Sequence, residues 1–420
     1  MTVPVQNKIA KLSNAVVAGQ VADAVDIARA LAAEGQAGAL SNRIVAHLLY
    51  ANGKADSAVP LLRRMTQFQP NDPSAHFLLA HHARLFGVER QAAGHEAAGV
   101  AAAREGLDKR MANFLAGDKP IIVGPWLSEP EFELLYWLPF LFHLQQRYGL
   151  PKERLVAISR GGASDWYAGI AGRTWDLVGT FGEDGTRELQ VKRQEEVTYA
   201  LQGTVTLVDA AIVEACSAEL GLEDPMVLHP AIMFDLLHLY WTGFMSLEAA
   251  TGFLAPYPAG WAGPAPEQAG TVAASFYARS YFDTEGSYNA NLPLSVAGTL
   301  AEAGVAATDL SPLYPATGTL LDLGQPPTVE GDGSGNLADF TRRVAASKGF
   351  VGTYGAGGFL AMALGKPAVM VVDTMAPMLA AHTLLADALL GGANGPSLSV
   401  HAGGDWDGIK AALDKLAKAG

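Results

Sequence analysis

The residues best suited to chemistry form a run of small side chains near the C-terminus: Gly352, Thr353, Tyr354, Gly355, Ala356, Gly357 and Gly358. A strand-like pattern at 349–352 precedes the run, a short helical pattern at 359–364 follows it, and a second strand is expected at 368–373. Backbone N–H groups at the start of a helix, with no Cβ in the way, form a site for an anion. The sequence therefore predicts that this loop binds a phosphate, and the diphosphate of a nucleotide is the preferred occupant.

Two common nucleotide-binding patterns are absent from this run. In a dinucleotide fingerprint the third glycine would stand where Leu360 is, and no acidic residue follows at the expected distance on a second strand. The Gly-Lys-Ser/Thr ending of a P-loop is missing as well. A nicotinamide cofactor and ATP hydrolysis are therefore disfavoured. The structural alternative is that the glycines only let a buried strand turn tightly into its helix.

Strand and helix patterns alternate from residue 119 onward. Strands are expected at 120–123, 155–158, 175–180, 204–208 and 226–228, and a long amphipathic helix is expected at 131–147. Strands that alternate with helices imply a parallel sheet, with ligand sites at the carboxyl ends of its strands.

A stretch rich in proline and glycine at 254–270 divides this region. The α/β pattern then restarts, with strands expected at 271–277 and 319–323 and helices at 289–303, 336–347 and 407–417. The sequence thus predicts an α/β fold of two Rossmann-like halves, residues 116–262 and 263–420, joined by a hinge. The ligand site is expected in the cleft between the halves.

The first 115 residues are periodic. Glycines recur every 34 residues and an alanine follows each glycine by five positions: Gly19, Gly53, Gly87 and Ala24, Ala58, Ala92. Paired helical patterns surround them, and this helix–turn–helix period resembles the tetratricopeptide repeat. Pro70 closes the second repeat and Asp72-Pro73 opens the next helix, whereas the first and third repeats lack the closing proline. Stacked repeats leave a concave face, which we expect to dock a protein partner; the alternative is an array that only caps the next domain.

Composition narrows the class of protein. Half of the 420 residues are hydrophobic and only 17% are charged, so large buried cores are expected. There is no stretch of 18 uncharged apolar residues and no apolar leader, which favours a cytoplasmic protein without membrane insertion. The net charge of −13 argues against nucleic acid as a partner. The single cysteine, Cys216, lies in a helical pattern and is expected to be a buried thiol.

The run 350–372, with its strand, small-residue loop, short helix, Gly-x-Pro and second strand, resembles the donor-site segment of GT-B glycosyltransferases. The resemblance covers residues 119–420, and the preceding repeats make the layout similar to that of the protein O-GlcNAc transferases and the bacterial flagellin glycosyltransferases. Thr353-Tyr354-Gly355 replaces the His-Gly-Gly of many such enzymes, so no role of that histidine is carried over.

The resemblance implies a metal-independent transferase with an all-α repeat domain (1–115), an acceptor half (116–262) and a donor half (263–420). A sugar would pass from a nucleotide-diphosphate sugar, which is a co-substrate and not a cofactor, to a protein docked on the repeats. Flagellin or another bacterial surface protein is one such acceptor. In that family the diphosphate lies on the loop, with a basic residue opposite.

Basic and backbone groups can be assigned to the donor on this basis. Arg279 is the first choice for the basic residue, since a guanidinium matches phosphate oxygens; pairing with Asp283 or Glu285 is the alternative. Arg160, directly after the strand at 155–158, is a comparable candidate for an anionic group. The turn at Gly324 is where backbone groups could contact the base.

Transfer to a hydroxyl needs a general base. Glu133 is the first candidate among the glutamates at 129, 131 and 133, because apolar neighbours favour its partial burial; stabilisation of a helix start is the alternative. Asp165 is a second candidate, with helix capping as its alternative. His229, at the end of the strand at 226–228, is a third, with a buried hydrogen-bonded histidine as its alternative.

Three other hypotheses compete with protein glycosylation. They are a transferase acting on a glycan or a lipid-linked sugar, a GT-B-like sugar-nucleotide epimerase, and a non-catalytic repeat scaffold. The sequence leaves open the nucleotide (UDP, GDP, dTDP or CMP), the sugar, the acceptor, the stereochemical outcome and the oligomeric state. No metal site is expected, because Asp405 and Asp407 are better explained by the cap of the last helix.

Overall fold

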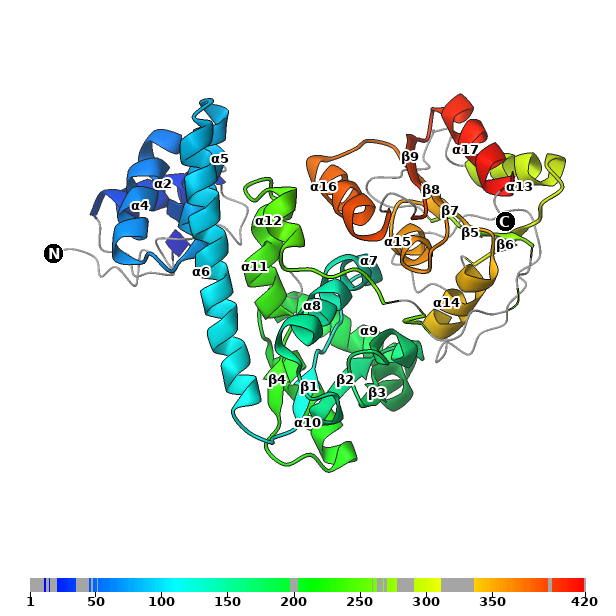
Figure 1. Ribbon diagram of the computed structural model, residues 1–420, viewed down its shortest axis with the longest axis horizontal. Coiled ribbons are helices and arrows are strands. Elements are labelled where there is room, and N and C mark those ends of the chain that lie inside the picture. The colour runs from blue at the N-terminus through cyan, green and yellow to red at the C-terminus, as the bar shows by residue number, and fades with distance from the viewer. Residues whose placement is uncertain are drawn as a thin grey trace. The chain divides into compact units, whose positions relative to one another are not determined.

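The computed structural model is a mixed α/β protein with two parallel sheets (Figure 1). It describes residues 21–34, 52–196, 203–258, 270–277, 291–310, 336–391 and 395–418, with shorter stretches inside 11–50 and 260–267. The chain forms two compact units. Met1–Ala116 and Leu236–Ala250 make up the first unit, and Gly117–Asp235 and Thr251–Gly420 make up the second, which contains both sheets.

Paired helices with glycine turns make up the first unit. Its longer described helices are α2 (Val21–Glu34), α4 (Ala55–Phe68), α5 (Pro73–Leu85) and α6 (Glu89–Leu115). Gly53 and Gly87 stand in the turns before α4 and α6 with φ of +69° and +68°, the left-handed region that favours glycine. The 34-residue spacing therefore predicted both turns correctly, while Gly19 lies outside the described residues.

Small side chains lie where these helices pack together, and an N-cap residue followed by proline begins α5. The repeated alanines, Ala24, Ala58 and Ala92, are all buried. Asp72 caps α5, because its Oδ1 accepts a hydrogen bond from the Ser74 N–H at 3.0 Å, and Pro73 occupies the first turn. The repeat pattern predicts a helix at 90–103, and helix α6 extends well beyond it, to Leu115.

The first sheet has four parallel strands in the order β3-β2-β1-β4. They are β1 (Ile121–Val123), β2 (Leu155–Ser159), β3 (Arg173–Asp176) and β4 (Met226–Leu228). The strand expected at 204–208 is wrong. Thr206 and Asp209 instead form a capping box that satisfies the first amides of α10 (Leu207–Leu220), so the chain enters a helix there.

The helical segments around the first sheet include one that changes its helix type along its length. The long helix expected at 131–147 is three consecutive pieces: α7 (Pro130–Phe132), the π-helical turn η1 (Glu133–Trp137) and α8 (Leu138–Tyr148). The others are the 3-10 turn η3 (Ala163–Tyr167), α9 (Leu177–Glu196) and α11 (Ala231–Trp241).

The second sheet has five parallel strands in the order β6-β5-β7-β8-β9. They are β5 (Val272–Ser275), β6 (Ala307–Asp309), β7 (Phe350–Thr353), β8 (Ala368–Val372) and β9 (Leu398–Ala402). Its helices are α13 (Leu292–Glu302), α14 (Asn336–Ala346), α15 (Ala356–Ala363), α16 (Pro377–Ala386) and α17 (Trp406–Lys418). β6 and β9 were not predicted, and the strand expected at 319–323 lies outside the described residues.

Both faces of the second sheet are covered (Figure 1). Val351, Val369 and Val371 share one buried cluster with apolar residues of α13 and α17. The intervening side chains, Phe350 and Met370, lie on the other face, against α15. A continuous apolar strand is expected where helices cover both faces of a parallel sheet.

The Pro/Gly-rich stretch predicted as a hinge is anchored. Trp261 is buried and its Nε1–H donates to the Ala363 carbonyl at 3.1 Å, while the Tyr257 hydroxyl donates to the Leu134 carbonyl. The two rings also contact each other, with 4.4 Å between centroids. Aromatic residues within the stretch thus hold it to the fold. Among the described residues no helix combines the length and apolarity needed to cross a membrane.

Candidate functional site

The small-residue loop lies at the carboxyl end of β7, beside the end of β5. The strand order reverses between these two strands, and open parallel α/β sheets bind ligands at such a reversal. Thr353 joins the two strand ends: its hydroxyl accepts from the Tyr277 N–H at 3.1 Å and donates to the Tyr277 carbonyl at 3.0 Å. The loop is therefore held where a ligand of this sheet is expected.

The glycines of the loop are required by packing. A Cβ on Gly357 would overlap the ring of Phe350, and one on Gly358 would overlap the side chain of Met370. A Cβ on Gly352 would overlap a backbone carbonyl of β5. Close contact between α15 and the sheet thus accounts for these glycines. This agrees with the structural alternative given above, in which the glycines let a buried strand turn tightly into its helix. Any affinity for an anion must come from the backbone amides.

Helix α15 begins without a side-chain cap. Gly355 is its N-cap residue, and no side-chain hydrogen bond to the cap is formed. The amides of Ala356, Gly357 and Gly358 have no acceptor inside the helix, because they belong to its first turn. An uncapped helix N-terminus attracts negative groups through these amides and the helix dipole. Residues 352–358 are all buried.

Tyr354 supports the loop and does not point to solvent. Its side chain is buried and its hydroxyl donates to the Leu379 carbonyl of α16 at 2.8 Å. The ring also contacts Phe359 edge-on, with 5.6 Å between centroids. This side chain connects the loop with α16.

Two residues that the sequence proposed separately, Glu133 and Arg160, form a buried ion pair. Nη2 of Arg160 lies 2.9 Å from Oε2 of Glu133, and the Tyr167 hydroxyl donates to Oε1 at 2.5 Å. Burial first, and then the charge of Glu133, raises the pKa of Tyr167 well above its ordinary value, so this hydroxyl keeps its proton. Both oxygens of Glu133 thus accept hydrogen bonds, from Arg160 and Tyr167. This arrangement favours a role in positioning η1 over a role as a general base.

This ion pair lies in the segment that packs against the loop helix. Helix α15 contacts α7 and η1 as well as β7 and β8. The carboxylate-bearing stretch of the first sheet and the small-residue loop of the second are therefore neighbours inside the second unit. Trp166 and Thr341 also link the two sheets' helices, with a hydrogen bond of 3.0 Å from Nε1 to Oγ1.

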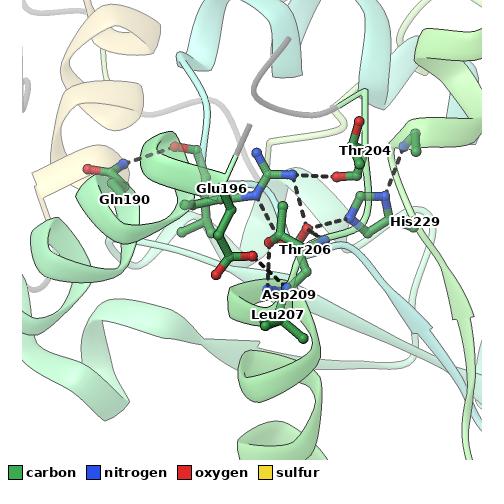
Figure 2. Close-up of polar contacts among 10 residues, drawn as sticks. Gln190, Glu196, Thr204, Thr206, Leu207, Asp209 and His229 are labelled. Atoms are coloured by element: carbon green, nitrogen blue, oxygen red, sulfur yellow. Dashed lines mark hydrogen bonds and ion pairs between the residues drawn. The ribbon is translucent and has the colours of Figure 1, made fainter. Parts of the chain in front are cut away.

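His229 is engaged at both ring nitrogens (Figure 2). Nε2 lies 3.2 Å from Oδ2 of Asp209, and Nδ1 accepts from the Ala231 N–H at 3.0 Å. The side chain is 5% exposed. The structure therefore favours the buried hydrogen-bonded histidine over the general base.

Asp209 is the centre of this cluster. Nε and Nη2 of Arg193 bind its two oxygens at 2.8 and 3.0 Å, and the Thr206 N–H donates to Oδ2 at 2.9 Å. Burial raises the pKa of Asp209, but hydrogen bonds from His229 and Arg193 and the charge of Arg193 outweigh it and lower the pKa to about 2.

Sequence reasoning missed Asp209, which contacts His229, and Arg193, which pairs with Asp209. For Asp209 a signal existed, because Thr206-x-x-Asp209 has the spacing of a capping box. For Arg193 no local signal marked a buried arginine, since it lies on a helix with many charged residues. Glu196, on the same helix, accepts from the Leu207 N–H at 2.7 Å and completes the start of α10 (Figure 2).

Helix capping, the alternative role expected for Asp165, is wrong. Asp165 lies exposed inside η3, whose N-cap residue is Gly162 at a φ of +73°. The turn before η3 is instead held by Asp176, whose Oδ2 accepts a hydrogen bond from the Gly162 N–H at 2.8 Å. Arg279 and Gly324 lie outside the described residues, so their roles stay predictions.

Two minor predictions are confirmed. Asp405 precedes α17 and its Oδ1 accepts from the Gly408 N–H at 3.1 Å, as expected of a cap. Cys216 is fully buried, and burial raises the pKa of its thiol to about 12.

No protein-family model matches the sequence, and no curated protein matches it at a significant level. A functional assignment therefore depends on the residues and their geometry.

Proposed function

We propose that the protein transfers a sugar from a nucleotide-diphosphate sugar to a protein acceptor. The observation that carries the proposal is the uncapped N-terminus of α15, which begins at the strand-order reversal between β5 and β7. In this proposal the diphosphate accepts hydrogen bonds from the amides of Ala356, Gly357 and Gly358. Charge that develops on the leaving diphosphate is then stabilised by the amides and the helix dipole.

The contact of α15 with α7 and η1 supports an acceptor position beside the donor. In this proposal Glu133 and Arg160 act together, because each neutralises the other's buried charge. Their contribution is to hold η1 in place against α15, so that groups on this segment face the donor. His229 is given no catalytic role, since both of its nitrogens are already engaged.

Calorimetry on the full chain tests the proposal. UDP, GDP and dTDP, the monophosphate of each, CMP, and the corresponding nucleotide sugars are titrated separately into the protein. We expect one nucleoside diphosphate to bind with a micromolar Kd, and the corresponding monophosphate to bind at least about tenfold more weakly, because it lacks one phosphate to contact the amides. If none of these ligands binds more tightly than millimolar, the proposal is wrong.

A further inference from the structure

A serine, a histidine and an aspartate are hydrogen-bonded in a row at one end of the second sheet. Ser399 and His401 lie on β9, the strand at the edge of the sheet that leads into α17 (Figure 1), and Asp405 directly precedes that helix. Oγ of Ser399 lies 2.5 Å from Nε2 of His401, and Nδ1 of His401 lies 3.1 Å from Oδ2 of Asp405. The imidazole thus joins a hydroxyl to a carboxylate, as in a Ser-His-Asp triad.

The carboxylate fixes the direction of both hydrogen bonds. Hydrogen bonds from His401 and from the Gly408 N–H lower the pKa of Asp405, so its carboxylate is ionised at neutral pH and can only accept. Nδ1 of a neutral His401 must then carry the ring proton, which leaves Nε2 as an acceptor. The Ser399 hydroxyl therefore donates to Nε2, the nitrogen that would take its proton in a nucleophilic attack.

The contact between His401 and Asp405 depends on a glycine. Oδ1 of Asp405 accepts from the Gly408 N–H at 3.1 Å, while Oδ2 bonds the imidazole. A Cβ on Gly408 would overlap Oδ2 of Asp405 and would stand 2.8 Å from Nδ1 of His401. The cap of α17 and a glycine in its first turn together hold the carboxylate against the ring.

The row lies on the opposite face of the sheet from α15. Ser399 and His401 pair in register with Val369 and Val371, which belong to the buried cluster under α13 and α17. Paired residues of neighbouring strands point to the same face, so both side chains lie on the α17 face. Chemistry at Ser399 is therefore independent of the proposed sugar transfer.

The free edge of β9 adds a backbone donor. The Ser397 carbonyl and the Gly403 N–H bond to β8, and backbone groups of a strand alternate between its two edges. The Val400 N–H thus points to the other edge, where none of the described strands pairs with β9. This amide directly follows Ser399, and the amide after the nucleophile is one of the oxyanion-hole donors of α/β-hydrolases.

We propose that Ser399, His401 and Asp405 form a catalytic site that cleaves small acyl esters through an acyl-serine. Oγ of Ser399 bonds to the acyl carbon as its proton passes to Nε2 of His401. The bond from that carbon to the leaving oxygen then breaks, and His401 returns the proton to that oxygen, which departs as an alcohol. Water attacks the acyl-serine by the same route and releases a carboxylic acid.

A fluorophosphonate probe on the full-length protein tests the nucleophile directly. Oγ of Ser399 would displace fluoride from phosphorus, so the intact mass should rise by one probe, and peptide mapping should place the probe on Ser399. Ser397, an exposed serine two positions earlier, is the internal control and should stay unlabelled. No labelling of Ser399, or equal labelling of both serines, would overturn the proposal. The measurement needs no variant, so it does not depend on the folding of one.

Hydrolysis of p-nitrophenyl acetate tests the acyl-serine. We expect Ser399→Ala to lower the rate at least about tenfold, because the nucleophile is removed. An imidazole can also cleave this ester by itself. An unchanged rate in a folded Ser399→Ala would therefore show that the serine takes no part, and would overturn the proposal.

Two further variants test the contact between His401 and Asp405. Asp405→Asn keeps an acceptor for the cap but no longer requires a proton on Nδ1, so labelling of Ser399 should slow at least about tenfold with little change in Tm. Gly408→Ala should slow labelling as well, whereas Gly404→Ala, with open space at its Cβ, should label like the wild type. Labelling at the wild-type rate in Asp405→Asn and Gly408→Ala would overturn the proposal.

Discussion

Arg160 and Glu133 lie 27 positions apart in sequence and form one buried ion pair, with 2.9 Å between Nη2 and Oε2. The pair connects the end of β2 with the π-helical turn η1, and Tyr167 occupies the second carboxylate oxygen. A buried charge that loses its partner is strongly destabilising, whereas the intact pair stabilises little. The pair therefore fixes the relative position of two segments.

Substitution of either member of this pair should reveal that constraint. Arg160→Met leaves the Glu133 carboxylate buried without its cation, so we expect the free energy of unfolding to fall by about 3–5 kcal/mol. Arg187→Met is the matched control, since Arg187 and Asp184 have exposed side chains, 70% and 97%, and should change stability by less than about 1 kcal/mol. Urea unfolding at neutral pH measures both. Equal losses for the two variants would contradict the role given to the buried pair.

Asp209 should make the free energy of unfolding depend on pH in the acidic range. Its pKa in the folded protein is about 2, below the ordinary value of 3.8, so folding favours the ionised form. The stabilisation is complete above about pH 4 and is lost as the pH falls towards about 2, and it amounts to about 2 kcal/mol. Unfolding free energies of the wild type and Asp209→Asn, measured across this range, should therefore converge towards low pH.

The exposed Asp184 supplies the control for this titration. The difference in unfolding free energy between the wild type and Asp184→Asn should stay nearly constant from about pH 5 to about pH 2, because exposed pairs contribute little. A difference between wild type and Asp209→Asn that is equally independent of pH would show that the Arg193 and His229 contacts do not stabilise the carboxylate.

Gly357 should not tolerate a methyl group. Its Cβ would overlap the ring of Phe350, so we expect Gly357→Ala to destabilise by about 1–3 kcal/mol or more through overpacking. Gly298→Ala is the opposite case. Gly298 lies in α13 with open space where a Cβ would stand, so alanine should stabilise by about 0.5–1 kcal/mol. Thermal unfolding of the two variants should thus shift in opposite directions.

Substitutions at Ala356 can test whether its backbone N–H binds the anion, separately from any effect of side-chain packing. Proline is tolerated at the first position of a helix, so Ala356→Pro should keep α15 while it removes one donor amide. If that amide binds the diphosphate, the Kd of the nucleotide found by calorimetry should rise about tenfold or more. Ala356→Ser keeps the amide and should bind like the wild type. Equal binding by folded proline and serine variants would contradict the proposed contact.

Sequence patterns predicted the helix starts and turns well where a few adjacent residues determine the conformation. The turn at Gly87 follows from the repeat period, and the start of α5 follows from Asp72-Pro73, because a positive φ and a helix cap each depend on a few adjacent residues. The strand-loop-helix order around Gly355 is of the same kind. The expected strand at 204–208 failed because the reciprocal cap of Thr206 and Asp209 outweighs β propensity.

Sequence by itself determined the α/β alternation, the helical repeat period, the capped helix starts and the position of the small-residue loop. Only the tertiary structure decided which side chains meet: Arg160 with Glu133, Asp209 with both Arg193 and His229, and Phe244 with His81. It also assigned the loop glycines to packing on Phe350 and Met370. The physical reason is that these contacts join segments far apart in the chain, and hydrophobic periodicity records only whether a position is buried, not what it is buried against.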